Sequence, residues 1–263
     1  MINIDHVLDG SGLFFLAGPC VVESEEICFR VAEELKKLSE KYNIPVIFKS
    51  SYAKANRLSG ESFSGLGLDT GLEILAKVKQ NFDLPLLTDV HETAETRMAA
   101  EVVDILQIPA FLCRQTELVR TAGATGKWIN IKKGQFLSPE DMDKIAAKAK
   151  SGKVLLTERG SSFGYHNLVV DFRSLMIMKR FGYPVVFDAT HSLQLPSGGG
   201  DISSGQPEFI IPFAKAAVAI GVNGLFVETH PEPARALSDA AAMLPLDRFE
   251  TLIIEVLKIR ERN

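Results

Sequence analysis

Residues 184–191 read Pro184-Val185-Val186-Phe187-Asp188-Ala189-Thr190-His191, and this pattern decides the fold. The continuous apolar run is typical of a parallel strand that is buried on both faces. Asp188 and His191 follow the run at once, where such a strand would end. Eight runs of this kind lie along the chain, at residues 13–17, 45–48, 84–88, 102–108, 128–131, 154–157, 184–187 and 224–227.

Segments with the periodicity of amphipathic helices separate these runs. Between the first two runs, an apolar stripe follows Ser24, a residue type that caps helix N-termini. Ser138-Pro139-Glu140-Asp141 predicts another helix start, and residues 246–262 predict a closing amphipathic helix. The stripe consists of Ile27, Val31, Leu35 and Leu38.

The chain has 263 residues, and no linker rich in Pro, Gly or Ser divides it into halves. A closed barrel of strand–helix units needs about 250 residues. We therefore predict an α/β fold, a single-domain (β/α)8 TIM barrel over residues 1–263 with a short N-terminal extension. An open, doubly wound sheet is the alternative that the pattern alone leaves open.

The composition is ordinary for a globular protein, with 46% hydrophobic and 24% charged residues and a formal net charge of −4. Lys and Arg are spread along the chain, whereas nucleic-acid binding usually needs a clustered basic face. Three cysteines do not suggest a secreted disulfide framework. The N-terminus lacks the features of a signal peptide, and no apolar run approaches the ~20 residues that cross a bilayer. We expect a cytoplasmic enzyme that binds neither nucleic acid nor membrane.

Reactive or polar side chains follow the predicted strands. In a (β/α)8 barrel the C-terminal ends of the strands meet at one mouth, where the active site lies. We therefore expect the following residues, which are distant in sequence, to gather there: Cys20, Lys49, Asp89, His91, Gln107, Lys132, Glu158, Arg159, Asp188, His191, Glu228 and His230.

Cationic side chains form one candidate group. Any one of them is more often a solvated surface charge, but several come directly after buried strands. Together they favour an anionic substrate with carboxylate and phosphate groups, which Arg binds in bidentate geometry and Lys binds as a point charge. A Schiff-base lysine at Lys49 or Lys132 is conceivable, although anion binding is the simpler interpretation. The cations are Lys49, Lys54, Arg57, Arg114, Lys132 and Arg159.

A second group could hold a metal ion. Its mixture of thiol, imidazole and carboxylate suits a first-row divalent ion such as Fe²⁺, Zn²⁺ or Mn²⁺, although no compact spacing announces the site. Cys20 alone could be a small buried hydrophobe and Asp239 a surface charge, while Cys28 and Cys113 are interpreted as packing residues. The candidate ligands are Cys20, His191, Glu228 and Asp239.

Of two glycine-containing stretches, one is a candidate lid and the other is an incomplete cofactor motif. Residues 196–205 could form a lid that closes over substrate and excludes water, or a plain loop, and the sequence favours neither. Gly65-Leu66-Gly67 does not complete a dinucleotide fingerprint, so NAD is not expected.

Eight short motifs occur in a fixed order: AGPCVVES (17–24), KANR (54–57), TDVHE (88–92), QIPAFLCRQ (107–115), IKKGQF (131–136), FGY (163–165), DATHS (188–192) and ETHPEP (228–233). Through them nearly the whole chain resembles the 3-deoxy-D-manno-octulosonate 8-phosphate synthases, also called 2-dehydro-3-deoxyphosphooctonate aldolases. The related heptulosonate synthases usually carry Lys-Pro-Arg where this chain has residues 54–57, so the octulosonate branch is favoured.

The resemblance implies a homotetrameric barrel and a transferase reaction of lipopolysaccharide sugar biosynthesis. The C3 carbon of phosphoenolpyruvate attacks the aldehyde of D-arabinose 5-phosphate, water adds at C2, and phosphate leaves with cleavage of the C–O bond. It also implies that Asp89 contacts sugar hydroxyls. The implied phosphoenolpyruvate ligands are Lys49, Lys54, Lys132 and Arg159, and the aldose-phosphate ligands are Asn56, Arg57 and, from a neighbouring subunit, Arg114.

The family divides into metal-requiring and metal-independent members, and the latter have Asn where this chain has Cys20. A thiolate is a strong ligand for a transition metal, whereas a neutral amide is a poor one. The resemblance therefore implies the metal-dependent group, with Cys20, His191, Glu228 and Asp239 as ligands. The metal could polarise the aldehyde, lower the pKa of an attacking water or only orient the substrates, and we expect orientation together with water activation, with His191 or His91 near the water. The implied catalytic residues are His191, Asp89, His91 and Lys132.

Three residues depart from the family pattern near the aldose-phosphate end: Leu58 stands where relatives often have Ser, and Ser64 and Pro207 where they often have Arg. The nearest alternative is therefore a heptulosonate 7-phosphate synthase that uses erythrose 4-phosphate. The chain could also be a Schiff-base aldolase or a non-catalytic barrel that binds sugar phosphates. The complete metal and anion sets argue against the non-catalytic barrel.

Overall fold

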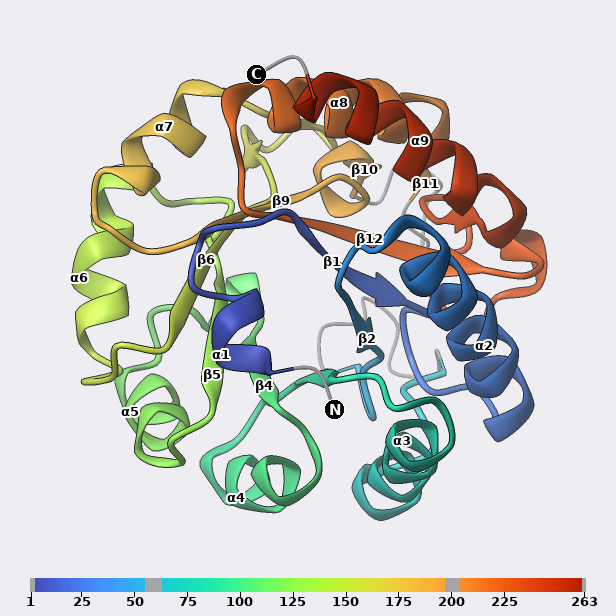
Figure 1. The fold of residues 1–263 in the computed structure, drawn as a ribbon. Coiled ribbons are helices and arrows are strands. Elements are labelled where there is room, and N and C mark those ends of the chain that lie inside the picture. The colour runs from blue at the N-terminus through green and yellow to red at the C-terminus, as the bar shows by residue number, and fades with distance from the viewer. Residues whose placement is uncertain (1–2, 55–62, 197–203, 262–263) are drawn as a thin grey trace.

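The computed structural model describes residues 3–54, 63–196 and 204–261. Within these ranges, eight parallel strands pair in the order β1-β2-β3-β4-β5-β6-β9-β12, and β12 pairs with β1 to close a barrel (Figure 1). The predicted (β/α)8 barrel is confirmed, and the open-sheet alternative is wrong. The strands are β1 (Phe14–Gly18), β2 (Val46–Lys49), β3 (Leu86–Asp89), β4 (Ile105–Ile108), β5 (Trp128–Lys132), β6 (Val154–Glu158), β9 (Val185–Asp188) and β12 (Gly224–His230).

Apart from the short α1, the helices form the outer layer around the strands (Figure 1). Their apolar faces and the outward side chains of the strands make up the larger of two hydrophobic clusters. Of the described helices, none is long and apolar enough to cross a membrane. The helices are α1 (Ile4–Val7), α2 (Glu25–Tyr42), α3 (Leu68–Phe82), α4 (Thr93–Val102), α5 (Thr116–Ala124), α6 (Met142–Ala147), α7 (Arg173–Lys179), α8 (Ile210–Ile220) and α9 (Phe249–Arg260).

Short strands extend the loops at the barrel mouth. Two antiparallel pairs follow β6 and β9, and β13 (Leu244–Pro245) pairs in parallel with the end of β12. The antiparallel pairs are β7 (Ser161–Ser162) with β8 (Leu168–Val169), and β10 (Gln194–Leu195) with β11 (Ser204–Gly205).

The local signals for helix starts had different outcomes. The Ser24 hydroxyl accepts a hydrogen bond from the Ile27 N–H at 3.2 Å, so the predicted cap of α2 is confirmed. Ser138 precedes a helical segment as predicted, but its hydroxyl donates to the Glu140 carboxylate and caps nothing. That segment is a 3-10 turn, Pro139–Asp141, which leads into α6. The closing helix likewise begins with a 3-10 turn, Leu246–Arg248, before α9.

Most predicted strand boundaries are within two residues of the observed ones, and the two largest differences are at β4 and β12. Val102 ends helix α4, and β4 begins only at Ile105, because the apolar run there spans both a helix end and a strand start. Strand β12 continues to His230, so Glu228 and His230 lie within the strand and not after it. Pairing with β13 accounts for this extension, because Thr229 and His230 are opposite Leu244 and Pro245.

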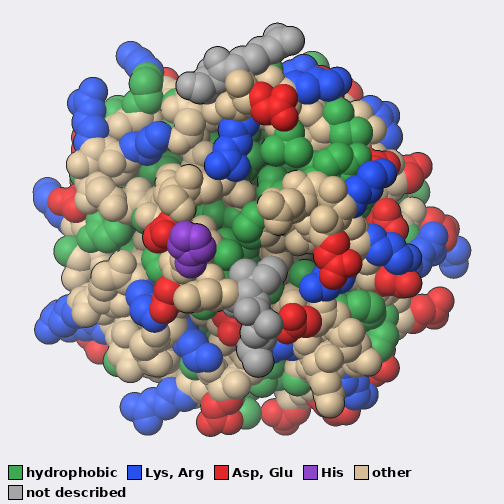
Figure 2. Space-filling model, in the orientation of Figure 1, with side chains coloured by type: hydrophobic (Ala, Val, Ile, Leu, Met, Phe, Trp, Pro, Cys, Tyr) green, Lys and Arg blue, Asp and Glu red, His purple; other side chains and the backbone are tan. Residues whose placement is uncertain are grey.

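The barrel interior is apolar at its lower end, where the N-terminal ends of the strands lie. Helix α1 lies across this end of the barrel in Figure 1, and its Ile4 and Val7 pack against the interior cluster. Acidic and basic side chains are interspersed around the rim of the same face in Figure 2. The cluster consists of Leu8, Phe14, Leu16, Ile47, Leu87, Ile105, Trp128, Leu155, Val186 and Phe226.

The alternation of side chains along each strand makes the interior polar at its upper end, where the C-terminal ends of the strands lie. Successive strand residues point to opposite faces, so the residue two positions after an inward apolar one also points inward. Leu87 is therefore followed inside by Asp89, Val186 by Asp188, and Phe226 by Glu228. This alternation places the reactive side chains directly above the apolar cluster, at the C-terminal mouth.

Candidate active site at the barrel mouth

Close packing of β1 against β2 positions the first two site residues. A Cβ on Gly18 would overlap the Lys49 carbonyl oxygen, so a side chain there is excluded. Beyond Gly18, the Ser51 N–H donates to the Cys20 carbonyl at 3.2 Å and the Val22 N–H donates to the Ser51 carbonyl at 2.9 Å. These contacts hold the Cys20 thiol and the Lys49 ammonium at the same side of the mouth.

Three of the four predicted metal ligands form a compact group. One ligand atom each from Cys20, Glu228 and Asp239 lie within 4.8 Å of one another. The Cys20 Sγ is 2.9 Å from Asp239 Oδ2 and 2.9 Å from Ser238 Oγ. Glu228 Oε2 is buried and has no hydrogen-bond partner among the described residues. A thiol and two carboxylates, one of which has an unsatisfied buried oxygen, are suitable ligands for a first-row divalent cation.

His191, the fourth predicted ligand, borders this group. Its Nε2 is 3.5 Å from Glu228 Oε1 and 3.7 Å from Asp239 Oδ2. Its Nδ1 is 2.8 Å from Asp188 Oδ2, while Asp188 Oδ1 accepts the His191 backbone N–H at 2.8 Å. When Nδ1–H donates to this carboxylate, the lone pair of Nε2 faces the other three ligands. A metal-bound histidine is typically oriented by such a carboxylate.

The thiol of Cys20 is kept protonated in the absence of a cation. Burial raises its pKa, and the Asp239 and Glu228 carboxylates raise it further. Asp239 has the opposite shift: burial works against its charged form, but His191 and Lys54 outweigh this effect, so its pKa lies well below the ordinary value. Asp239 also adopts a left-handed backbone conformation, with φ of 50°, which is uncommon outside Gly and marks a constrained position.

The buried cations of the mouth are each held by an acceptor. Lys49 Nζ donates to Glu228 Oε1 and to the Cys20 carbonyl, both at 2.9 Å. Lys54 Nζ lies 3.9 Å from the same Glu228 oxygen. Lys132 Nζ lies 2.8 Å from Asp188 Oδ2 and 3.8 Å from the centroid of the Phe226 ring. Burial lowers the pKa of Lys132, and the Asp188 carboxylate opposes that shift.

Arg159 is linked to the metal-ligand group through an amide. Its Nη2 donates to Gln194 Oε1 at 2.9 Å, and Gln194 Nε2 donates to Asp239 Oδ1 at 3.1 Å. Glu158, the preceding residue, accepts the backbone N–H groups of Arg159 and Gly160 at 3.0 and 2.7 Å. Glu158 therefore supports the loop that carries Arg159 and does not itself point into the mouth.

Asp89 and His91 lie on the β3 side of the mouth. The Asp89 carboxylate accepts from Ser51 Oγ at 2.5 Å and from the Gln107 amide. Burial would raise its pKa, but Lys49, Lys54 and Lys132 outweigh burial and keep it ionised. His91 packs edge-on against Tyr52, with the ring centroids 5.7 Å apart, and burial lowers its pKa.

Several predicted residues lie elsewhere. Asn56, Arg57 and Leu58 are outside the described residues, as is most of the glycine-rich stretch 196–205. Arg114 is exposed, and its side chain makes no ion pair within the described chain. Ser64 is exposed, with its backbone carbonyl accepting from the Lys54 N–H at 2.7 Å. Pro207 begins a short 3-10 turn before α8.

Sequence analysis missed four residues that the structure places at the site: Ser51, Gln194, Phe226 and Ser238. Asp188 is among the residues expected at the mouth, but the sequence pattern assigns it no role, although its spacing of three residues from His191 is a usable signal. Gln194 and Ser238 lie in loops without a distinguishing motif, and Phe226 appears in sequence as one more apolar strand residue.

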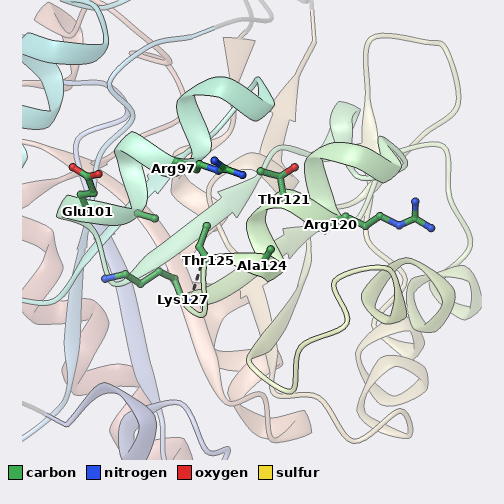
Figure 3. A pocket seen from close by; sticks show the side chains of 8 residues that line it. Arg97, Glu101, Arg120, Thr121, Ala124, Thr125 and Lys127 are labelled. Atoms are coloured by element: carbon green, nitrogen blue, oxygen red, sulfur yellow. Dashed lines mark hydrogen bonds between the residues drawn. The ribbon is translucent and has the colours of Figure 1, made fainter.

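A groove on the outer surface of the barrel is remote from this mouth. It has a volume of about 610 Å³ and lies on the outside of the barrel between α4 and α5 (Figure 3). Arg97 and Glu101 of α4, Arg120 and Thr121 of α5, and Lys127 before β5 line it, and it shares no residue with the mouth. None of the residues proposed for catalysis or metal binding lines this groove.

Comparison with known proteins assigns this barrel to a class. A family model described as the DAHP synthetase I family matches residues 2–262. The chain therefore belongs to this family.

Individual relatives define the branch. A protein from Dichelobacter nodosus is 56% identical over 254 residues, covering 95% of this chain and 92% of its own length. One from Acidithiobacillus ferrooxidans is 56% identical over 243 residues, with 91% and 86% covered, and one from a Cyanothece strain is 52% identical over 255 residues, with 96% and 93% covered. All three are named 2-dehydro-3-deoxyphosphooctonate aldolase. The chain belongs to the family of these aldolases.

Proposed function

We propose that this protein condenses phosphoenolpyruvate with D-arabinose 5-phosphate and water to give 3-deoxy-D-manno-octulosonate 8-phosphate and phosphate. The observation that carries this proposal is the position of the compact Cys20–Glu228–Asp239 group directly beside the buried cations of the mouth. The names of the relatives supply the product, a phosphooctonate. As the resemblance to the octulosonate synthases implies, the reaction would belong to lipopolysaccharide sugar biosynthesis.

A divalent transition metal, Fe²⁺, Zn²⁺ or Mn²⁺, would be held by Cys20, His191, Glu228 and Asp239. When bound, such a cation can orient oxygen atoms of the substrates and lower the pKa of a water molecule. The fit rests on the donor set: a thiol, an imidazole oriented by Asp188, and two carboxylates, with Glu228 Oε2 buried and unsatisfied in the described structure.

The charges of the mouth also favour a cation. Lys49, Lys54, Lys132 and Arg159 are accompanied by four carboxylates among the described residues, those of Asp89, Asp188, Glu228 and Asp239. The fixed charges therefore nearly cancel. Two phosphorylated substrates bring several negative charges, and a divalent ion would supply positive charge that the side chains alone do not.

The side chains of the mouth would position the two substrates. Lys49, Lys54, Lys132 and Arg159 would hold the carboxylate and phosphate of phosphoenolpyruvate and stabilise the phosphate as its C–O bond breaks. The bond that forms joins C3 of phosphoenolpyruvate to the aldehyde carbon of the aldose, and a water oxygen adds at C2. Asp89 would orient sugar hydroxyls, and the neutral imidazole of His91 is available to accept a proton near that water.

The phosphate end of the aldose is assigned to the residues that the resemblance implies. Asn56 and Arg57 are proposed for its phosphate, together with Arg114 of a neighbouring subunit in a homotetramer. The exposure of Arg114, which makes no ion pair in the described single chain, is compatible with this role.

Substrate identity is tested by phosphate release from phosphoenolpyruvate in the presence of Mn²⁺, with arabinose 5-phosphate or erythrose 4-phosphate as the acceptor. We expect turnover with the five-carbon sugar and little with the shorter one. Turnover only with erythrose 4-phosphate would refute the octulosonate assignment, and Leu58, Ser64 and Pro207 would then be the first residues to exchange. Turnover with neither sugar would refute the enzymatic proposal itself.

A further inference from the structure

A chain of buried hydrogen bonds runs around the barrel interior beneath the mouth. Thr157 of β6 donates its hydroxyl to Asn130 Oδ1 at 2.5 Å, and Asn130 Nδ2 donates to Gln107 Oε1 at 2.7 Å. Gln107 Nε2 donates in turn to Asp89 Oδ1. Asn130 and Thr157 are fully buried, and Gln107 is 1% exposed. This series of hydrogen bonds therefore connects Asp89 to Thr157, three strands away, through side chains that are buried from solvent.

Strand register brings these side chains together. Asp89 is opposite Gln107, and Gln107 is opposite Asn130, so the three lie side by side on β3, β4 and β5. All of them, with Thr157, occupy inward positions two residues above the apolar cluster formed by Leu87, Ile105, Trp128 and Leu155. This buried polar layer lies between the apolar cluster and the substrate-facing cations.

While Asp89 is ionised, the hydrogen bonds of this series can point in only one direction, from Thr157 towards Asp89. An ionised carboxylate only accepts hydrogen bonds, so Gln107 must present its NH₂ group to Asp89 and its oxygen to Asn130. Asn130 must then present its own NH₂ group to Gln107, which leaves its oxygen for Thr157. The Thr157 hydroxyl is therefore the terminal donor that satisfies the whole arrangement, and buried networks of this kind are strong only when every member is satisfied.

We infer that Thr157 and Asn130 are positioning residues, which act through Gln107 to hold the Asp89 carboxylate in the orientation that the aldose requires. The Ser51 hydroxyl occupies the other Asp89 oxygen at 2.5 Å, so the carboxylate is held from both sides. Neither Thr157 nor Asn130 needs to touch substrate. The inference rests on the proposed function, because it assumes that Asp89 contacts the sugar.

The test compares Thr157→Val, Thr157→Ser and a matched control, Thr88→Val. Thr157→Val keeps the shape but removes the terminal donor and leaves Asn130 Oδ1 buried without a partner. Thr88 lies on β3 beside Asp89, and its buried hydroxyl has no hydrogen-bond partner among the described residues. The control therefore makes the same substitution in a barrel strand without breaking the chain of hydrogen bonds.

We expect Thr157→Val to raise the KM for arabinose 5-phosphate by roughly tenfold, with the KM for phosphoenolpyruvate and the metal content unchanged. Thr157→Ser and Thr88→Val should behave like the wild type. Asn130→Leu should raise the same KM, and the double variant with Thr157→Val should be no worse than Asn130→Leu alone, because both changes interrupt one chain. Asn130→Leu also tests the inference if Thr157→Val does not fold.

An unchanged KM for arabinose 5-phosphate in a folded Thr157→Val or Asn130→Leu variant would overturn the inference. So would equal rises for both substrates, or an effect of Thr88→Val as large as that of Thr157→Val. Turnover by the wild type and by Thr88→Val serves as a separate check on the proposed function. If both are inactive with either aldose, the function is wrong and this inference fails with it; if both are active, the Thr157 result decides the inference alone.

Discussion

The Cys20 thiol shows how a buried, uncharged group can be prepared for a cation. It donates a hydrogen bond to Asp239 Oδ2 at 2.9 Å, and burial together with two nearby carboxylates raises its pKa. A metal ion would displace that proton, so metal affinity should fall as the pH falls. The Asp188–His191 contact contributes in a different way, because it directs Nε2 towards the ligand group before any ion arrives.

His91 gives a prediction for the pH dependence of stability. Burial lowers its pKa in the folded protein, so below about pH 6.5 the unfolded chain takes up a proton that the folded protein resists. The contribution of neutral His91 to stability is thus complete above that pH and is lost as the pH falls. We expect His91→Gln to flatten the decline in melting temperature between about pH 6.5 and pH 5, measured with a chelator present so that metal binding does not contribute. An identical slope in wild type and variant would contradict this account.

At the residue scale, the sequence identified side chains with evident chemistry but not the residues that support them. Lys49, Asp89 and Lys132 end strands, and that position alone predicted their place at the mouth. Asn130 and Thr157 lie inside apolar runs, where a polar residue carries no chemical signal of its own. Their roles depend on the register between neighbouring strands, which a single sequence does not specify.

At the scale of elements, helix caps provide a direct test of local physics. Ser24 accepts from the Ile27 N–H, whereas Ser138 occupies the equivalent position before a 3-10 turn and bonds to Glu140 instead. Ser24→Ala should lower the free energy of unfolding by about 1 kcal/mol, while Ser138→Ala should change it by less than about 0.5 kcal/mol. Urea unfolding measures the free energy of unfolding of both variants. If Ser24→Ala lowers it no more than Ser138→Ala does, the cap of α2 does not contribute the expected stability.

The order of strands and helices was predictable because each buried parallel strand appears as a short apolar run. Boundaries were less predictable where two signals merge. The run at residues 102–108 covers the end of α4 as well as β4, and only backbone hydrogen bonding divides them. In β12 the strand continues through Glu228 and His230, polar residues that the sequence pattern assigned to a loop.

At the scale of the whole molecule, the barrel separates stability from chemistry. Its lower end is closed by α1 over an apolar cluster, and its upper end collects side chains from several strands and the loops that follow them. Closure between β1 and β12 brings Cys20 and Glu228, which lie near opposite ends of the sequence, into one group of candidate metal ligands. Barrel topology therefore made the grouping predictable, whereas distances and ligand geometry required the structure.

Metal dependence of the condensation is tested most directly by titrating Mn²⁺ or Zn²⁺ into chelator-stripped protein. Phosphate release from phosphoenolpyruvate is followed with arabinose 5-phosphate as the acceptor. We predict no turnover in the stripped wild type and a recovery that rises in proportion to bound metal. The folded Cys20→Ala variant should neither retain the ion nor recover. Full turnover of the stripped wild type, or of metal-free Cys20→Ala, would contradict the account.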